Sequence, residues 1–154
     1  MSPAEEGGTP PTNRMVVALL ALIGAFISFY LMAYSLGWMG SLICGMSSCE
    51  TVQQSSYSKI GPVPVAAIGL VGYLVLLMLA ILGLQPGKRS SKPIGMLLVA
   101  GGFAGVAFSA YLTFLEVAVI HAWCIWCVTS AIVITVIFVA SLPEVARTRK
   151  GGTS

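Results

Sequence analysis

Two pairs of cysteines carry the chemistry that this sequence can do. Cys124 and Cys127 have the C-x-x-C spacing and open an apolar run that ends at Leu142. Residues three apart on a helix lie on one face, and the positive end of the helix dipole stabilises a thiolate. A low-pKa thiol beside a second cysteine is the usual arrangement of a redox centre. The other pair, Cys44 and Cys49, lies in a polar loop.

Other uses of four cysteines stay open at this point. Structural disulfides are one, although a disulfide between residues three apart closes a very small loop and stabilises weakly. A four-thiolate zinc site is another, although an oxidising compartment does not keep four thiolates reduced. Haem attachment needs a histidine directly after the second cysteine, and Val128 stands there. No metal site is therefore expected.

The composition indicates a membrane protein. Of the 154 residues, 57% are hydrophobic and only 8% are charged, and the mean hydropathy is +0.95. Soluble domains carry about 25% charged residues. The net charge of +3 is small, and the basic residues form short clusters between apolar runs. This pattern sets membrane topology and does not suggest nucleic-acid binding.

Four apolar runs predict four transmembrane helices, hence an all-α fold built as a helix bundle. The folded domain is expected to cover residues 15–142, with a disordered tail at 1–14, an outer loop at 36–61 and a second tail at 143–154. A short interfacial helix is expected between Glu50 and Lys59. Gly101 and Gly105 have the spacing that lets membrane helices approach closely. The four spans are residues 15–34, 63–84, 94–120 and 124–142.

The basic residues predict the topology. Seven of the eight Lys and Arg fall in the two tails and the second loop, which leaves only Lys59 in the first loop. By the positive-inside rule both termini are cytoplasmic, and both cysteine pairs face the outside of the cell membrane. An oxidising outer face also agrees with the use of cysteine pairs.

Short motifs follow the loop cysteines in a characteristic order. The run CETVQQSSY at 49–57 comes first, then GPVP at 61–64, Gly69, the Gly72-Tyr73 step and finally AWCIWC at 122–127. Each motif is weak alone, but the ordered set covers about residues 44–127 on four spans. In this order the chain resembles the vitamin K epoxide reductase family, in its bacterial branch.

The resemblance implies a membrane thiol–disulfide oxidoreductase that passes electrons to a quinone of the menaquinone or ubiquinone type. Electrons would come from a secreted DsbA-like protein with a thioredoxin fold, so that disulfides form outside the cytoplasm. By position, Cys44 would meet this partner and Cys49 would exchange with Cys124. Cys127 would then react with the quinone, and Ser55 matches a family serine near the quinone site.

Three departures from the family pattern refine this expectation. Cys44 and Cys49 are separated by four residues, fewer than in vertebrate relatives, which shortens the tether of the loop pair. Ala131 stands where vertebrate members carry a tyrosine tied to vitamin K chemistry, which argues against epoxide reduction. No thioredoxin-like domain follows Leu142, so the partner is expected to be a separate protein.

A bundle of apolar helices with a few polar groups suits a quinone pocket. Tyr111 and Phe114 of the third run are candidates for quinone binding, and the other aromatic candidates are Tyr73, Phe108, Trp123 and Trp126.

Two titratable residues lie near the outer end of the third run. Glu116 lies inside the run, and a carboxylate in a span marks a functional site by default. A proton-transfer or hydrogen-bonding role and simple contact with water are both open. His121 is expected to be a solvated loop histidine.

Two other functions stay open. The same fold can work in the opposite direction, as a quinone or quinone-epoxide reductase in a cofactor cycle. A small four-helix transporter subunit with structural cysteines is the other candidate, but transporters place polar groups along a path, and Glu116 is the only charge within the expected spans. DsbB-like disulfide oxidases share the logic but carry their cysteine pairs in the reverse order.

Overall fold

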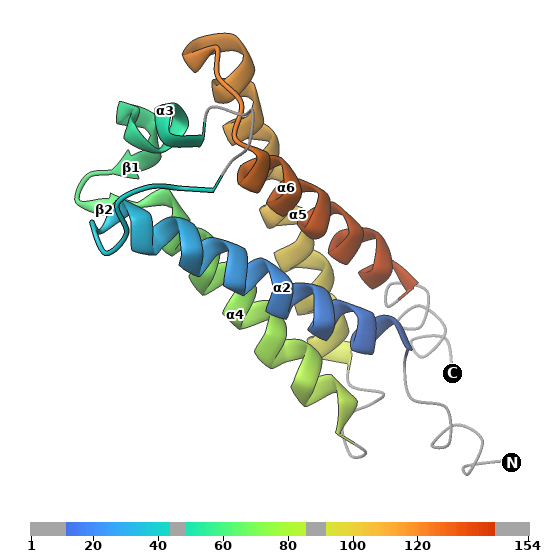
Figure 1. The fold of residues 1–154 in the computed structure, drawn as a ribbon. Coiled ribbons are helices and arrows are strands. Elements are labelled where there is room, and N and C mark those ends of the chain that lie inside the picture. The colour runs from blue at the N-terminus through green and yellow to red at the C-terminus, as the bar shows by residue number, and fades with distance from the viewer. Residues whose placement is uncertain (1–11, 44–48, 86–91, 144–154) are drawn as a thin grey trace, which may run out of the picture.

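The computed structural model describes residues 12–43, 49–85 and 92–143, and within this part the chain is almost entirely helical. Four long helices lie side by side as a bundle (Figure 1). They are α2 (Thr12–Ser35), α4 (Val65–Leu84), α5 (Lys92–Phe114) and α6 (Ile125–Ser141). The all-α bundle predicted from the four apolar runs is confirmed.

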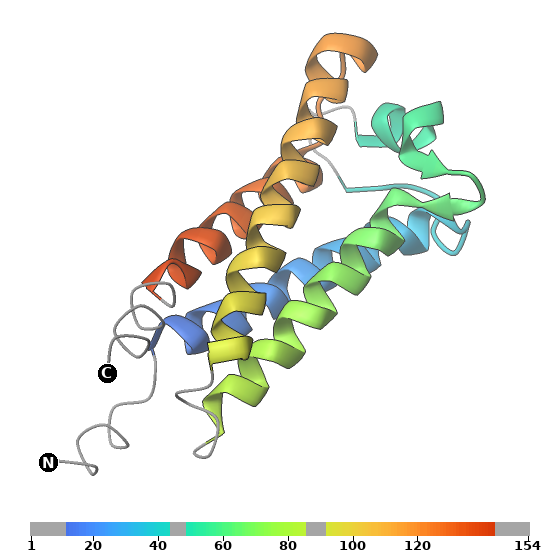
Figure 2. The same ribbon diagram turned by 180° about the vertical axis from the view of Figure 1, so that it is seen from behind.

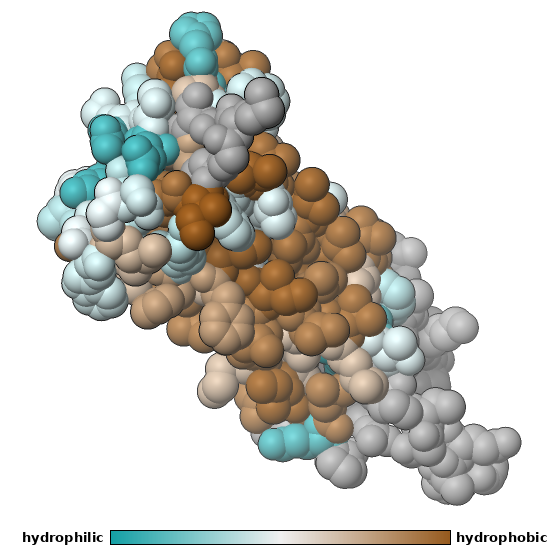
Figure 3. All heavy atoms as spheres, in the orientation of Figure 1, coloured by the Kyte–Doolittle hydropathy of each residue, from teal (hydrophilic) through white to brown (hydrophobic). Residues whose placement is uncertain are grey.

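Three of the helical segments are long and apolar enough to cross a membrane, namely Thr12–Ser35, Val65–Leu84 and Pro93–Ile120. The fourth, α6, has 17 residues and is also apolar. On the face drawn in Figure 3, hydrophobic residues cover the long helices, and hydrophilic residues gather toward the ends of the bundle. This distribution is what a lipid-facing bundle requires, because the hydrocarbon interior excludes unpaired polar groups.

Helix α2 begins at Thr12, three residues before the predicted start of the first span. Arg14 lies in its first turn and is only 1% exposed. Its guanidinium donates a hydrogen bond of 2.8 Å to the carbonyl oxygen of Gly83 near the end of α4. This bond satisfies a carbonyl that the end of α4 leaves without a helical partner.

The first loop holds several short elements. Helix α3 (Cys49–Gln54) is followed by a 3₁₀ turn, η1 (Ser56–Ser58), and by a hairpin of β1 (Lys59–Ile60) and β2 (Val63–Pro64). The expected helix therefore ends before Ser55. The hairpin turns at Gly61, which has a φ of 63°, in the manner of two-residue hairpin loops with glycine at the first position.

The third span changes its helical type near one end. A π-helix, η3 (Leu115–Ile120), continues α5, and residues 121–124 then connect it to α6. Both views place this connection and α3 at the same end of the bundle, opposite the start of α2 and the end of α6 (Figures 1 and 2). Both ends of the described chain thus lie on one side of the bundle and the first loop on the other.

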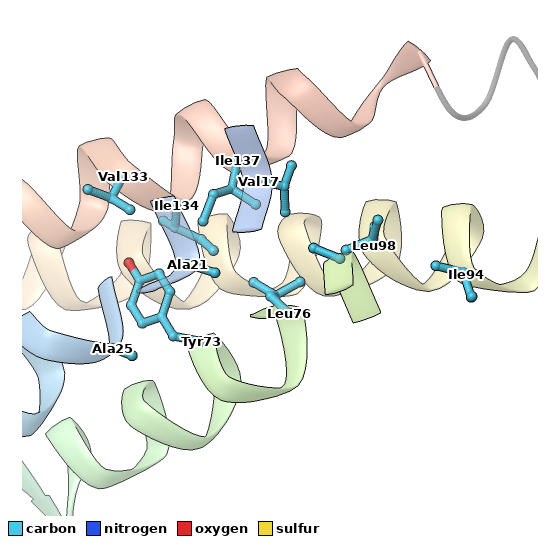
Figure 4. Packing of buried hydrophobic residues seen from close by; sticks show 11 residues of the cluster. Val17, Ala21, Ala25, Tyr73, Leu76, Ile94, Leu98, Val133, Ile134 and Ile137 are labelled. Atoms are coloured by element: carbon cyan, nitrogen blue, oxygen red, sulfur yellow. The ribbon is translucent and has the colours of Figure 1, made fainter. Parts of the chain in front are cut away.

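The long helices pack around one buried cluster, here called the bundle core (Figure 4). Helix α4 comes so close to α2 that a Cβ atom built on Gly24 would lie 2.2 Å from the ring of Tyr73. Gly101 and Gly105 face Leu76 and Ile134 in the same way, as their spacing predicted. The bundle core consists of Val17, Ala21, Ala25, Tyr73, Leu76, Ala80, Ile94, Leu98, Val133, Ile134 and Ile137.

Candidate functional site

A second buried cluster, here called the outer cluster, brings the two cysteine-bearing segments together. Cys49, at the start of α3, and Cys124, just before α6, are both 0% exposed and belong to the same cluster. They lie 75 positions apart in the chain, so the packing of α3 onto the bundle creates this proximity. The cluster consists of Ile27, Leu31, Leu42, Cys49, Val52, Ala122 and Cys124.

The cysteines are in different redox states. Cys49 is disulfide-bonded, whereas Cys124 and Cys127 are free thiols. Cys44 lies outside the described residues, so its predicted contact with a partner stays a prediction.

The C-x-x-C pair lies at the N-terminus of α6. Cys124 is the N-cap residue, with an extended backbone, and its carbonyl accepts a hydrogen bond of 3.0 Å from the Val128 N–H.

Glu116 reaches the same two cysteines from η3. Its Oε2 atom accepts a hydrogen bond of 3.2 Å from the backbone N–H of Cys124, and its side chain lines the same cavity as Cys127. Its own carbonyl accepts a bond of 3.0 Å from the Ala122 N–H. The chain turns between them at His121, which is exposed and has a left-handed φ of 56°. Glu116 itself is only 3% exposed, so it does not simply reach water.

A large cavity begins at Cys127. Its volume is about 750 Å³, which is within the usual size range of ligand pockets. Its walls come from α2, α3, η1, α4, α5, η3 and α6. The side-chain amide of Gln53 lies 3.7 Å from the Cys127 sulfur, as a weak N–H donor to it. Most of the lining is apolar, and its polar members include Ser28, Gln53, Ser55, Tyr73, Glu116, Cys127 and Ser130.

The cavity also reaches the outer surface of the bundle. Several of its apolar wall residues are exposed, among them Ile68 at 38%, Val75 at 52% and Leu97 at 52%. They lie on α4 and α5, in the part of the chain that the membrane surrounds. An apolar ring with polar carbonyl oxygens therefore fits this space, because it would find an apolar wall and a few hydrogen-bonding groups beside a thiol.

The model of the vitamin K epoxide reductase family matches residues 15–142. The chain belongs to the vitamin K epoxide reductase family. The match includes the four long helices, the outer loop and both cysteine pairs, and it makes the chain an oxidoreductase of a membrane family with disulfide and quinone redox chemistry.

Within this family member, the structure separates the residues expected at the quinone site. Ser55 lines the cavity, and its hydroxyl donates a hydrogen bond of 2.7 Å to the carbonyl of Val52. Tyr111 and Phe114 are 57% and 60% exposed, and neither is among the cavity-lining residues. Helix α5 is apolar on all sides, so its sequence does not indicate which aromatic residues face inward.

The remaining aromatic candidates also divide. Tyr73 and Phe108 line the cavity. Trp123 borders a separate, smaller cavity of about 290 Å³, which also contains Ala131, the position of the vertebrate tyrosine. Trp126 packs against the outer cluster instead.

Two hydrogen bonds hold the first loop at Ile43, and the sequence does not indicate them; they are here called the latch. The N–H of Ile43 donates to the hydroxyl of Tyr30, and its carbonyl accepts from the indole N–H of Trp126, both at 2.8 Å. The two aromatic rings themselves lie 5.1 Å apart. These contacts fix the backbone directly before Cys44 to α2 and α6. Nothing in the local sequence indicates them, because they join residues 13 and 83 positions apart.

Proposed function

We propose that this chain oxidises the thiols of a secreted DsbA-like protein with a thioredoxin fold and delivers the electrons to a membrane quinone. The supporting observation is that Cys49 and Cys124 share the outer cluster while Cys127 lies in the wall of the cavity. One buried cysteine can thus exchange with the loop pair, and the other faces an apolar compartment.

The proposed relay conserves electrons at each exchange. The partner's two thiols reduce the Cys44–Cys49 disulfide and become a disulfide themselves. The Cys49 thiolate then attacks the Cys124 sulfur of a Cys124–Cys127 disulfide, which forms a Cys49–Cys124 bond and releases Cys127 as a thiolate. Attack by Cys44 on Cys49 releases Cys124, and two electrons have moved to the helix pair. Cys49 in a disulfide beside free Cys124 and Cys127 is the state that follows this step.

The quinone, when bound, supplies an acceptor for two electrons and two protons. The apolar walls of α4 and α5 would hold its ring, and Ser55 and Gln53 of the outer loop would lie at the polar side. Residues of α3 and η3 line the cavity beside Cys127.

The relay requires the outer loop to face an oxidising compartment. A cysteine introduced at exposed Lys59 should react with a membrane-impermeant maleimide in intact cells. A cysteine at Lys88, in the basic second loop, should react only after the membrane is broken. The opposite pattern would place the cysteine pairs on the cytoplasmic side and remove the secreted partner from the proposal.

The function is tested by mixing the purified chain with a reduced thioredoxin-fold protein and a quinone and following quinone reduction. The Cys44→Ala variant should lose this activity with the protein donor. It should keep quinone reduction with a small dithiol, because a small thiol approaches Cys124 directly whereas a folded protein is too large to reach a buried sulfur. Equal loss with both donors would contradict the proposed order of the relay.

A further inference from the structure

Glu116 is a buried carboxyl group beside the reactive thiols. It accepts a hydrogen bond from the backbone N–H of Cys124, and it lines the same cavity as Cys127. We propose, resting on the function proposed above, that Glu116 is a catalytic residue that accepts the thiol proton of Cys127 and passes it into the cavity.

The surroundings of Glu116 hold no positive partner. In residues 12–43, 49–85 and 92–143 no lysine, arginine or histidine side chain pairs with it, and the titratable groups that face it are the thiols of Cys124 and Cys127. A buried carboxyl group without a counter-charge is costly in a span. This cost is consistent with a group that exchanges a proton with its neighbours.

The helix geometry directs Glu116 toward the cysteines. The residue lies in the π-helical turn η3, and π-helical turns are frequent at functional sites. The wider turn and the reversal at His121 place the start of α6 directly against the Glu116 side chain. The next position, Val117, is 44% exposed. A carboxyl group at that position would lie in lipid or water instead.

The proton balance of the reaction requires such a group. Oxidation of Cys124 and Cys127 to a disulfide removes two electrons and two protons, and reduction of a quinone to a quinol consumes the same numbers. Glu116 takes the Cys127 proton and releases it to an acceptor oxygen in the cavity. The Cys124 proton follows in a second transfer, because the Glu116 carboxylate also lies at Cys124, and Glu116 then ends in its starting state.

The same carboxylate also caps the Cys124 backbone N–H, which is a purely structural role. Glu116→Gln separates the two roles, since an amide oxygen can accept that bond but does not take up a proton near neutral pH. Glu116→Asp keeps the acid on a shorter side chain. Glu50→Gln is the matched control, because Glu50 also accepts a backbone bond, 3.0 Å from the Leu42 N–H, without contacting a free thiol.

The first readout is an infrared difference spectrum between oxidised and reduced protein, recorded without quinone. Without quinone no acceptor takes the proton from Glu116, so oxidation of the thiols should leave it there and give a carboxylic acid band that is absent in Glu116→Gln and unchanged in Glu50→Gln. The second readout is turnover with a small dithiol and a quinone. Glu116→Gln should lower kcat by about 10²-fold, in line with the usual contribution of a positioned acid or base, and Glu116→Asp should restore part of it.

An unchanged infrared spectrum together with wild-type kcat in Glu116→Gln would overturn the proposal and leave Glu116 as a cap. A wild-type chain that reduces no quinone would contradict the proposed function instead. The infrared test remains informative in that case, because it needs only the thiols and the carboxyl group.

Discussion

The two buried clusters differ in how they are built. The bundle core comes from the middles of long, regular helices, and its members are aliphatic side chains and Tyr73. The outer cluster comes from helix ends and short segments, and it contains Cys49 and Cys124. The regular helices therefore fix the relative positions of the four spans. The irregular segments at the helix ends carry the reactive cysteines. Helix ends suit this purpose because they leave backbone groups free to bind side chains.

Tyr73 links the two regions. Its ring packs on Gly24 in the bundle core, and its hydroxyl donates a hydrogen bond of 2.8 Å to the Ser130 carbonyl on α6, one turn after Cys127. A substitution in the bundle core that displaces Tyr73 can therefore change the position of α6, the helix that carries Cys127.

The comparison predicts that a one-atom change in the outer region removes activity without unfolding the protein. Cys127→Ser should reduce turnover to the uncatalysed background, because Cys124 then has no resolving thiol, while the melting temperature stays close to wild type. A disulfide between Cys49 and Cys124 should accumulate and be detected by non-reducing peptide mass spectrometry. Turnover equal to wild type would exclude the C-x-x-C pair as the redox centre.

The reverse outcome is expected in the bundle core. Gly24→Ala would press a methyl group into the Tyr73 ring, so the free energy of unfolding should fall by about 1–3 kcal/mol. The measurement is loss of helical circular dichroism during titration with sodium dodecyl sulfate in mixed micelles.

Gly72→Ala is the control for this substitution. Nothing lies within 4 Å of a Cβ atom at Gly72, and alanine in place of a helical glycine stabilises by about 0.5–1 kcal/mol. Two glycine-to-alanine changes on facing helices should thus have opposite signs. Equal effects would show that the close approach of α2 and α4 does not determine stability.

The smallest expected effect concerns the latch before Cys44. Trp126→Phe keeps an aromatic ring but loses the hydrogen bond to Ile43, a loss of about 0.5–1.5 kcal/mol. Amide hydrogen exchange at Ile43 should therefore become about two- to tenfold faster.

Trp123→Phe is the matched control, since Trp123 is 53% exposed and forms no hydrogen bond to the described part of the loop. Exchange at Ile43 that is as slow in Trp126→Phe as in this control would mean that ring packing with Tyr30, rather than the indole N–H, holds the loop.

The regular part of the fold could be predicted from sequence because its signals are local. Apolar runs of sufficient length gave the long helices, and the glycine spacing gave the close approach of α5 to its neighbours. The start of α2 differs from the prediction because the Arg14 side chain binds a distant backbone carbonyl. Its hydrogen bond to Gly83 joins residues 69 positions apart.

The outer region could be predicted only in part. Motif order indicated the family. Ser55 lines the cavity, and its role at the quinone site stays a prediction. Periodicity could not orient Tyr111 and Phe114 on a helix that is apolar on every side. A π-helical turn has no distinct sequence signature, so the contact of Glu116 with the cysteines follows only from the three-dimensional arrangement. The Ile43 latch could not be predicted either, because its two hydrogen bonds join residues far apart in the chain.

The exposed apolar wall of the cavity on α4 and α5 has a consequence for how the enzyme is supplied. A hydrophobic acceptor that enters from this side diffuses in two dimensions, and its relevant concentration is its mole fraction in the lipid rather than its molarity in the sample. Diluting a fixed amount of protein and acceptor with more lipid or detergent should slow turnover, although the molar amounts stay constant. Saturation curves measured at different lipid contents should then superimpose only when they are plotted against surface density.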